Sequence, residues 1–221
     1  LGPNDQFLPP TEVAYALESK TQGGRMDTEG EVQMYKDLTS AEVIADSTWD
    51  GVRLTTMRVT FPRFILSEFN THRKFSRNSA SSRAIPVKRQ IELVRESPFI
   101  PQAWPKNQAG MQAREEVSPW NAAHALLDWE TAIGEMIATA ENLAGYGVHK
   151  QIASRLLEPF MWHTVIVSST EWENFFLQRD HEDAQPEMQT TAKAMRKALD
   201  ESTPTEWHYH VPFNTVTVEE Q

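Results

Sequence analysis

Arginine, hydroxyl and amide side chains alternate in one short stretch of the chain, and this combination of groups is suited to binding phosphate. Residues 69–91 contain six Lys or Arg and no acidic residue, although the 221-residue chain has a formal net charge of −10. Guanidinium groups form two-pronged hydrogen bonds to phosphate oxygens, and small hydroxyl residues let backbone N–H groups approach the same atoms. The stretch therefore predicts a site for an anionic ligand, with phosphate as the best match.

A basic stretch also suits a nucleic-acid-binding module, in which the loop would contact backbone phosphates. Two features argue against a long polyanion as the partner. The rest of the chain is acidic and would repel it, and Phe75 is the single aromatic residue in the run 70–83, which leaves no stacking platform for bases. Nucleic acid is therefore not the expected partner, and the module is kept as an alternative from another class.

Composition restricts the class of protein further. With 39% hydrophobic and 24% charged residues, and no apolar run near the roughly 20 residues that cross a bilayer, we expect a cytoplasmic globular protein with no membrane partner. The chain has no cysteine, which excludes disulfides, thiolate zinc sites and a cysteine nucleophile. Its seven histidines form no H-E-x-x-H pattern, so no metal site is expected.

The basic stretch must be positioned by regular elements on either side. The β-rich runs 41–46 and 53–60 flank Asp50-Gly51, which predicts two strands joined by a hairpin turn. Pro62 opens a helix that ends near His72, and the basic stretch follows as a loop. A further strand is expected over 160–168. Further helices are expected over 88–96, from 119 with Ser118 as its cap to a break at 145–147, and over 149–157, 171–179 and 185–201.

This order of elements predicts an α/β (α+β) fold with a mixed sheet flanked by helices. Residues 1–38 are polar and read as an N-terminal arm, and residues 39–221 read as a single catalytic domain. The connection 98–118 is long, which is typical of a functional loop, and the tail after Pro204 is expected to be irregular.

Two sequence blocks resemble one known family. Positions 72–83 read H-R-x-x-S-x-N-x-x-S-x-R, which resembles the R-H-R-x-x-S-x-N-x-x-S-x-R signature of the flavin-dependent thymidylate synthases. Positions 174–179 and 184–187 read N-F-F-L-Q-R and A-Q-x-E, which resemble that family's N-x-x-x-x-R and A-Q-x-E block, and Arg155 matches an upstream arginine. The matches fall in the family's order over residues 41–200, and we identify the chain as a divergent member.

The resemblance implies a homotetramer that binds FAD, with each active site at a subunit interface. It implies transfer of a one-carbon unit from methylenetetrahydrofolate to C5 of a deoxypyrimidine monophosphate, most simply dUMP to dTMP, with NADPH as the reductant. In this family no enzyme cysteine attacks the base. The absence of cysteine therefore fits, and it argues against the cysteine-dependent thymidylate synthases.

The resemblance also assigns roles to individual residues. Arg179 and Ser81 would be catalytic, with Arg179 facing the pyrimidine, where its charge stabilises the anion that develops as C5 becomes nucleophilic. Without the resemblance, the expected role of Arg179 is a surface ion pair with Asp180 or Glu182. Cofactor-binding roles would belong to His72, Arg73, Ser79, Ser168, Asn174 and Asp183. Substrate-binding roles would belong to Glu68, Thr71, Ser81, Ser82, Arg83, Arg155 and Arg179.

The chain departs from the family pattern near the expected flavin. Thr71 replaces an arginine, so one cationic contact is lost or comes from elsewhere, for instance from Lys74 or Arg77. Ser79 replaces a frequent glutamate, and Asp183 replaces a histidine. These changes leave open a hydroxymethylase on the same scaffold, in which water adds to the transferred carbon, and an inactive relative that binds flavin or nucleotide.

Glu68 stands where the family has a glutamine that contacts the nucleotide. A glutamine amide donates and accepts hydrogen bonds, whereas an ionised carboxylate only accepts them. A carboxylate at the base edge suits the N4 amino group of cytosine better than O4 of uracil. The sequence therefore leaves dCMP as an alternative substrate, beside the alternative that Glu68 pairs with a nearby arginine and never reads the base.

Overall fold

The computed structural model describes residues 24–26, 32–34, 36–81, 83–109 and 115–212. They group into two compact units, each treated by itself below. Unit 1 contains the described residues up to Asp37 together with Val87–Phe160, and unit 2 contains Leu38–Pro86 and the described residues from Met161 onward. The expected division into an arm, 1–38, and one catalytic domain, 39–221, stays a prediction.

Unit 1 consists mainly of helices. The short strands β1 (Gly24–Met26) and β2 (Val32–Met34) pair antiparallel. The helical elements are α3 (Val87–Glu96), α4 (Pro119–Gly145), α5 (Lys150–Ala153) and the 3₁₀ helix η2 (Ser154–Phe160).

The start of α4 follows the predicted local rule. The Ser118 side chain accepts a hydrogen bond from the Asn121 N–H, and Pro119 occupies the first turn, where its missing N–H costs nothing. The predicted helix 149–157 was wrong in its second half, where the chain forms a 3₁₀ helix. Pro159 lies inside that segment, and a proline disfavours the α conformation in the residue before it.

Unit 2 is built on a mixed sheet, as predicted. Its five strands run in the spatial order β5-β6-β4-β3-β7, with every neighbouring pair antiparallel except the parallel pair of β3 and β7. The strands are β3 (Ser40–Trp49), β4 (Val52–Pro62), β5 (Ser76–Ser79), β6 (Trp162–Ser169) and β7 (Thr205–Glu206).

The hairpin predicted at Asp50-Gly51 is confirmed. Asp50 has φ 49° and Gly51 has φ 75°, so both turn residues are left-handed, as a two-residue hairpin loop between twisted strands requires. After β4 the chain continues into the 3₁₀ helix η1 (Arg63–Ile65) and α2 (Leu66–Phe69). His72 therefore follows directly after a helical end, as predicted.

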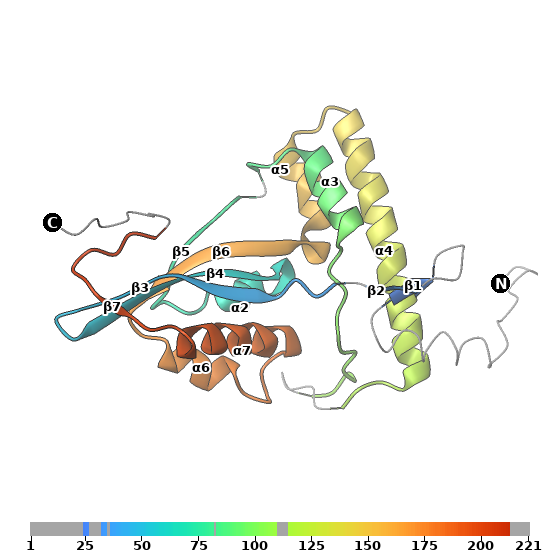
Figure 1. Ribbon diagram of the computed structural model, residues 1–221. Coiled ribbons are helices and arrows are strands. Elements are labelled where there is room, and N and C mark those ends of the chain that lie inside the picture. Colours follow the sequence, from blue (N-terminus) through green and yellow to red (C-terminus); the bar gives the residue numbers. More distant parts are fainter. Residues whose placement is uncertain (1–23, 27–31, 35, 82, 110–114, 213–221) are drawn as a thin grey trace, which may run out of the picture. The chain divides into compact units, whose positions relative to one another are not determined.

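The helices α6 (Glu173–Arg179) and α7 (Pro186–Asp200) lie along one face of the sheet (Figure 1). The strands contribute alternate apolar side chains to this face, and the core is completed by α2, α6 and α7. Each fully buried large side chain stabilises the fold by roughly 1.5–3 kcal/mol. The largest fully buried side chains of this core are Phe61, Phe69, Phe175, Met57, Ile65, Met188 and Met195.

Two segments expected to be irregular form strands. β5 lies inside the expected loop 70–83 and pairs with β6, and β7 lies in the tail after Pro204. Ser76–Ser79 has no apolar alternation, because three of its four side chains face solvent and backbone pairing alone holds it at the sheet edge. None of the helices among the described residues is long and apolar enough to cross a membrane.

Candidate functional site

Arg179, His72 and Thr71 form a hydrogen-bonded cluster in unit 2. The Arg179 Nε donates to His72 Nε2 at 2.9 Å, and Arg179 Nη2 lies 3.4 Å from Thr71 Oγ1. Arg179 is the last residue of α6, and His72 and Thr71 follow the end of α2. The two sequence blocks that carry the family resemblance therefore meet in space.

His72 is a neutral hydrogen-bond acceptor. Its side chain is buried, with its ring edge-on to Phe175 at 4.8 Å between centroids. Burial, helped by the nearby charges of Arg179 and Arg77, lowers its pKa from the ordinary 6.5 to about 4. Because Nε2 accepts from Arg179, the ring proton sits on Nδ1.

Two side chains hold the loop that carries His72 in place. Arg77 Nη1 donates to the carbonyl oxygens of Phe69 and His72 at 3.3 and 3.2 Å. Lys74 pairs with Glu171 at 2.8 Å. Lys74 is therefore committed to a carboxylate and Arg77 to backbone carbonyl oxygens beside His72, so neither side chain takes the place of the family arginine next to Arg179.

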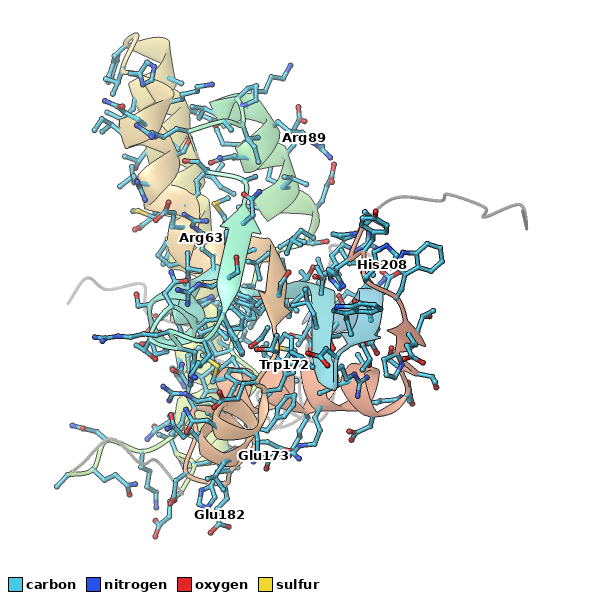
Figure 2. The ribbon with its side chains drawn as sticks, turned by 90° about the vertical axis from the view of Figure 1, so that its left-hand side faces the viewer. Arg63, Arg89, Trp172, Glu173, Glu182 and His208 are labelled. Atoms are coloured by element: carbon cyan, nitrogen blue, oxygen red, sulfur yellow. The ribbon has the colours of Figure 1, made fainter. Side chains whose placement is uncertain are left out.

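The expected surface ion pair of Arg179 is not formed. Asp180 pairs with Arg196 at 2.8 Å, and the Arg196 guanidinium lies over the Phe176 ring at 4.6 Å from its centroid. Glu182 lies in the turn between α6 and α7, away from the strands (Figure 2). Among the residues that the structure describes, no carboxylate pairs with Arg179, and its positive charge stays uncompensated in its cluster.

Glu68 lies one helical turn before Thr71, whose Oγ1 donates to the Glu68 carbonyl oxygen at 2.7 Å. The Glu68 side chain is exposed and its carboxylate makes no hydrogen bond or ion pair with any described residue. The arginine pairing considered for Glu68 is thus not present in the described part of the chain. Its backbone adjoins Thr71 of the Arg179 cluster, and no described residue engages its carboxylate.

Arg73 and the segment from β5 to Pro86 offer donors for an anion that no described residue engages. Ser81 accepts a hydrogen bond from the Arg83 N–H at 3.3 Å and its carbonyl accepts from Ala84 at 2.8 Å, which closes a tight turn. The guanidinium groups of Arg73 and Arg83 are exposed and contact no described hydrogen-bond acceptor. Ser79 is exposed at the end of β5, and Ser82 lies outside the described residues. This donor set fits the phosphate groups of a nucleotide or of FAD.

The remaining predicted residues lie in different environments. Asn174 Oδ1 accepts from Gln178 at 3.2 Å on the exposed side of α6 (neighbouring Trp172 and Glu173 are marked in Figure 2). Asp183 follows α6, with its carboxylate 3.6 Å from His181 Nδ1. Arg155 belongs to unit 1, where it pairs with Glu158 at 2.9 Å.

Ser168 belongs to a polar network that sequence reasoning missed. Its Oγ lies 2.6 Å from Thr56 Oγ1, and Thr56 Oγ1 lies 2.7 Å from Nε2 of His210. His210 lies in the tail after Pro204, which the sequence predicts to be irregular. No local signal could identify it, because its partners lie more than 150 residues away in the chain.

Comparison with known families matches residues 15–205 to the model described as thymidylate synthase complementing protein. The chain belongs to this family, the flavin-dependent thymidylate synthases, as its two sequence blocks predicted. A comparison with curated proteins found no match.

Similar solved structures include the UMP/dUMP methylase PolB from Streptomyces cacaoi, bound with 5-Br dUMP, with a TM-score of 0.60 and 15% identity over 75% of this chain and 91% of that chain. The same methylase bound with 5-Br UMP has a TM-score of 0.61 and 15% identity over 75% of this chain and 90% of that chain. At this identity the likeness establishes a shared fold.

Proposed function

We propose that this protein transfers a one-carbon unit from methylenetetrahydrofolate to C5 of a pyrimidine nucleoside monophosphate, most simply converting dUMP to dTMP. The carrying observation is the Arg179 cation, which is held by a neutral imidazole rather than neutralised by a carboxylate. Family membership supports the proposal, and so does the likeness in fold to a protein described as a UMP/dUMP methylase.

The exposed donors suit both FAD and the nucleotide, because each carries phosphate. Arg73 would bind the cofactor, and Ser81 and Arg83 would bind the nucleotide phosphate, because guanidinium groups that no described residue engages can form charge-assisted hydrogen bonds to it. FAD would supply hydride transfer, with NADPH as its reductant. Assembly into a homotetramer with active sites at subunit interfaces stays a prediction.

In the proposed reaction Arg179 acts on the pyrimidine. Negative charge develops on the O2 and N3 side of the base as C5 becomes nucleophilic, and a preorganised cation stabilises that charge without reorganising. His72 orients the guanidinium by accepting its Nε–H at Nε2. Because the imidazole is neutral, it does not cancel the positive charge of Arg179. Arg77, by donating to the His72 carbonyl oxygen, holds the loop that presents the imidazole.

A second candidate reaction is favoured by one observation, the uncommitted carboxylate of Glu68. An acceptor at the base edge matches the amino group of cytosine, so dCMP is the alternative substrate. The alternative product is a hydroxymethyl group, which forms if water rather than hydride adds to the transferred carbon.

The deciding experiment is mass spectrometry of the product after incubating the protein with FAD, NADPH, methylenetetrahydrofolate and dUMP, UMP or dCMP. We expect a methyl gain on dUMP. A hydroxymethyl gain, or turnover of dCMP alone, would favour the second candidate. Flavin binding without a product on any base would contradict both and favour an inactive relative, and tight salt-sensitive binding of nucleic acid without flavin would favour the nucleic-acid module.

A further inference from the structure

A hydrogen-bonded chain of polar side chains crosses three strands of the sheet in unit 2. Ser47 Oγ on β3 lies 2.8 Å from Nδ1 of His210, and the other ring nitrogen lies 2.7 Å from Thr56 Oγ1 on β4. Thr56 Oγ1 lies 2.6 Å from Ser168 Oγ on β6. This series of hydrogen bonds ends at Ser168, which is directly opposite Ser76 of β5. We call it the His210 relay.

The C-terminal segment fixes the His210 ring over these strands. β7 pairs with Ser47 and Thr48, and the Trp207 N–H donates to the Thr48 carbonyl oxygen at 3.0 Å. The His208 ring packs against Trp49 with 5.3 Å between centroids, and Figure 2 shows His208 beside the β3 end of the sheet. Three consecutive anchors therefore hold the backbone just before His210.

The hydrogen bonds of the relay can run in either of two directions, depending on which ring nitrogen of His210 carries the proton. Burial lowers the pKa of His210, partly offset by the charge of Asp46, so the ring is neutral near pH 7 and carries a single N–H. With the proton on Nε2, the ring donates to Thr56, Thr56 donates to Ser168, and the Ser168 hydrogen is free for a ligand. With the proton on Nδ1, Thr56 donates to the ring, Ser168 donates to Thr56, and Ser168 offers only lone pairs.

We propose that His210 is a positioning residue that makes Ser168 a hydrogen-bond donor to an oxygen atom of the bound ligand. This inference rests on the proposed function and on the cofactor-binding role that the family resemblance implies for Ser168. The uncommitted Arg73 and Arg83 indicate an anionic, oxygen-rich ligand, and such a ligand favours the direction that ends in a donor. Bonds aligned in one direction also polarise and strengthen one another.

The coupling is tested first without ligand, by the ring ¹⁵N chemical shifts of His210, which report the position of the ring proton. We expect Ser168→Ala to change the populations of the two ring forms although Ser168 does not touch the ring, because it removes one end of the relay. Unchanged His210 shifts in S168A would overturn the inference. Adding FAD to the wild-type protein should move the proton toward Nε2, and a move toward Nδ1 would also overturn it.

The second test is a double-mutant cycle on FAD affinity, measured by flavin fluorescence with the full chain. His210→Ala and Ser168→Ala should each weaken binding about fivefold, the worth of one hydrogen bond, and the double variant should lose little more. Fully additive losses would overturn the relay. Tyr209→Ala is the matched control, since Tyr209 is exposed and its ring packs on His208, which is not a member of the relay, and its FAD affinity should stay at the wild-type value.

Failure of the proposed function is distinguishable from failure of this inference. If the wild-type protein binds no FAD, the proposed function is wrong, and the ligand-free His210 shifts in S168A still decide the relay. If the wild-type protein binds FAD and H210A binds it equally well, only the inference is wrong.

Discussion

Arg179 donates its Nε–H to Nε2 of His72 across 2.9 Å, which ties a permanent cation to a neutral imidazole. A carboxylate in the same place would hold the guanidinium equally well but would cancel its charge. An imidazole with a depressed pKa supplies the acceptor without the negative charge. The pair therefore fixes the orientation of Arg179 and leaves its charge available to a substrate.

The first prediction concerns the charge of Arg179. Arg179→Ala should reduce kcat/KM for dTMP formation by about 100- to 1000-fold, the usual loss when a preorganised charge-stabilising group is removed. Arg179→Lys should recover only part of the rate, because a lysine keeps the charge but lacks the Nε–H that is directed by His72. Steady-state kinetics with dUMP measures both.

Arg95→Ala is the control for Arg179, because Arg95 is an exposed arginine paired with Glu141 in unit 1. It should leave kcat/KM unchanged. If R179A and R95A behaved alike, Arg179 would be an ordinary surface residue and the proposed role of the cluster would be wrong.

The second prediction is a pH dependence of stability that comes from His72. Its folded pKa of about 4 lies below its ordinary 6.5, so between these values the unfolded chain binds the additional proton. The free energy of unfolding should therefore fall as the pH drops from 6.5 toward 4. Urea denaturation across this range should show a shallower fall in His72→Gln, which keeps an acceptor for Arg179 but does not titrate. Parallel curves for the two proteins would refute this assignment.

Local rules predicted the parts of the fold that depend on neighbours in sequence. The Asp50-Gly51 turn and the Ser118 cap are short-range features, and both were predicted from residue types alone. The segment Ser76–Ser79 was missed, since its side chains carry no hydrophobic pattern and its strand conformation comes from pairing with β6. An edge strand of this kind is specified by its partner more than by its own sequence.

In the candidate site, too, some features follow from the sequence and others only from the tertiary fold. The motif spacing indicated His72 and Arg179 as functional residues, but their direct contact joins positions 107 apart and follows only from the packing of α6 against the sheet. His210 carried no sequence signal at all, because its role depends on β7 placing the tail beside β3. Contacts between residues that are distant in sequence cannot be predicted from local sequence patterns.

The third prediction concerns the anchor of α7 on the sheet. Asp46, with a side chain only 5% exposed, accepts from Arg53 at 2.9 and 2.6 Å and from Ser202 at 2.6 Å, and Arg53 also donates to the carbonyl oxygens of Leu199 and Ser202. Asp46→Ala leaves Arg53 without its carboxylate partner and should lower the free energy of unfolding by about 3 kcal/mol. Urea denaturation at pH 7 measures the loss.

Glu42→Ala is a matched control, because Glu42 is also a β3 carboxylate paired with an arginine of β4, Arg58, but is exposed. Its cost should be less than about 1 kcal/mol. Burial by itself raises the pKa of Asp46, but hydrogen bonds from Arg53, Ser202 and Thr55 hold the pKa below its ordinary 3.8. The D46A difference should therefore persist down to about that pH and shrink below it. Equal costs for the two variants would contradict the anchor.

The fourth prediction concerns how Glu68 affects the choice of base. Its carboxylate is exposed, has no described partner, and lies one helical turn from the Thr71 hydroxyl that meets Arg179. An ionised carboxylate accepts but does not donate, so it favours the amino group of cytosine over O4 of uracil. Glu68→Gln should therefore lower the ratio of kcat/KM for dCMP to that for dUMP by about tenfold, a typical discrimination for one polar contact to a base edge.

Competition between dCMP and dUMP in one reaction, read by mass spectrometry, gives this ratio directly and cancels differences in enzyme folding. Ser67→Ala is the control, since Ser67 is exposed on the same helix and contacts no described hydrogen-bond partner. If E68Q and S67A both keep the wild-type ratio, the carboxylate does not reach the base. A ratio that changes only in E68Q would mean that the Glu68 carboxylate reaches the base and favours cytosine more than a glutamine in its place does.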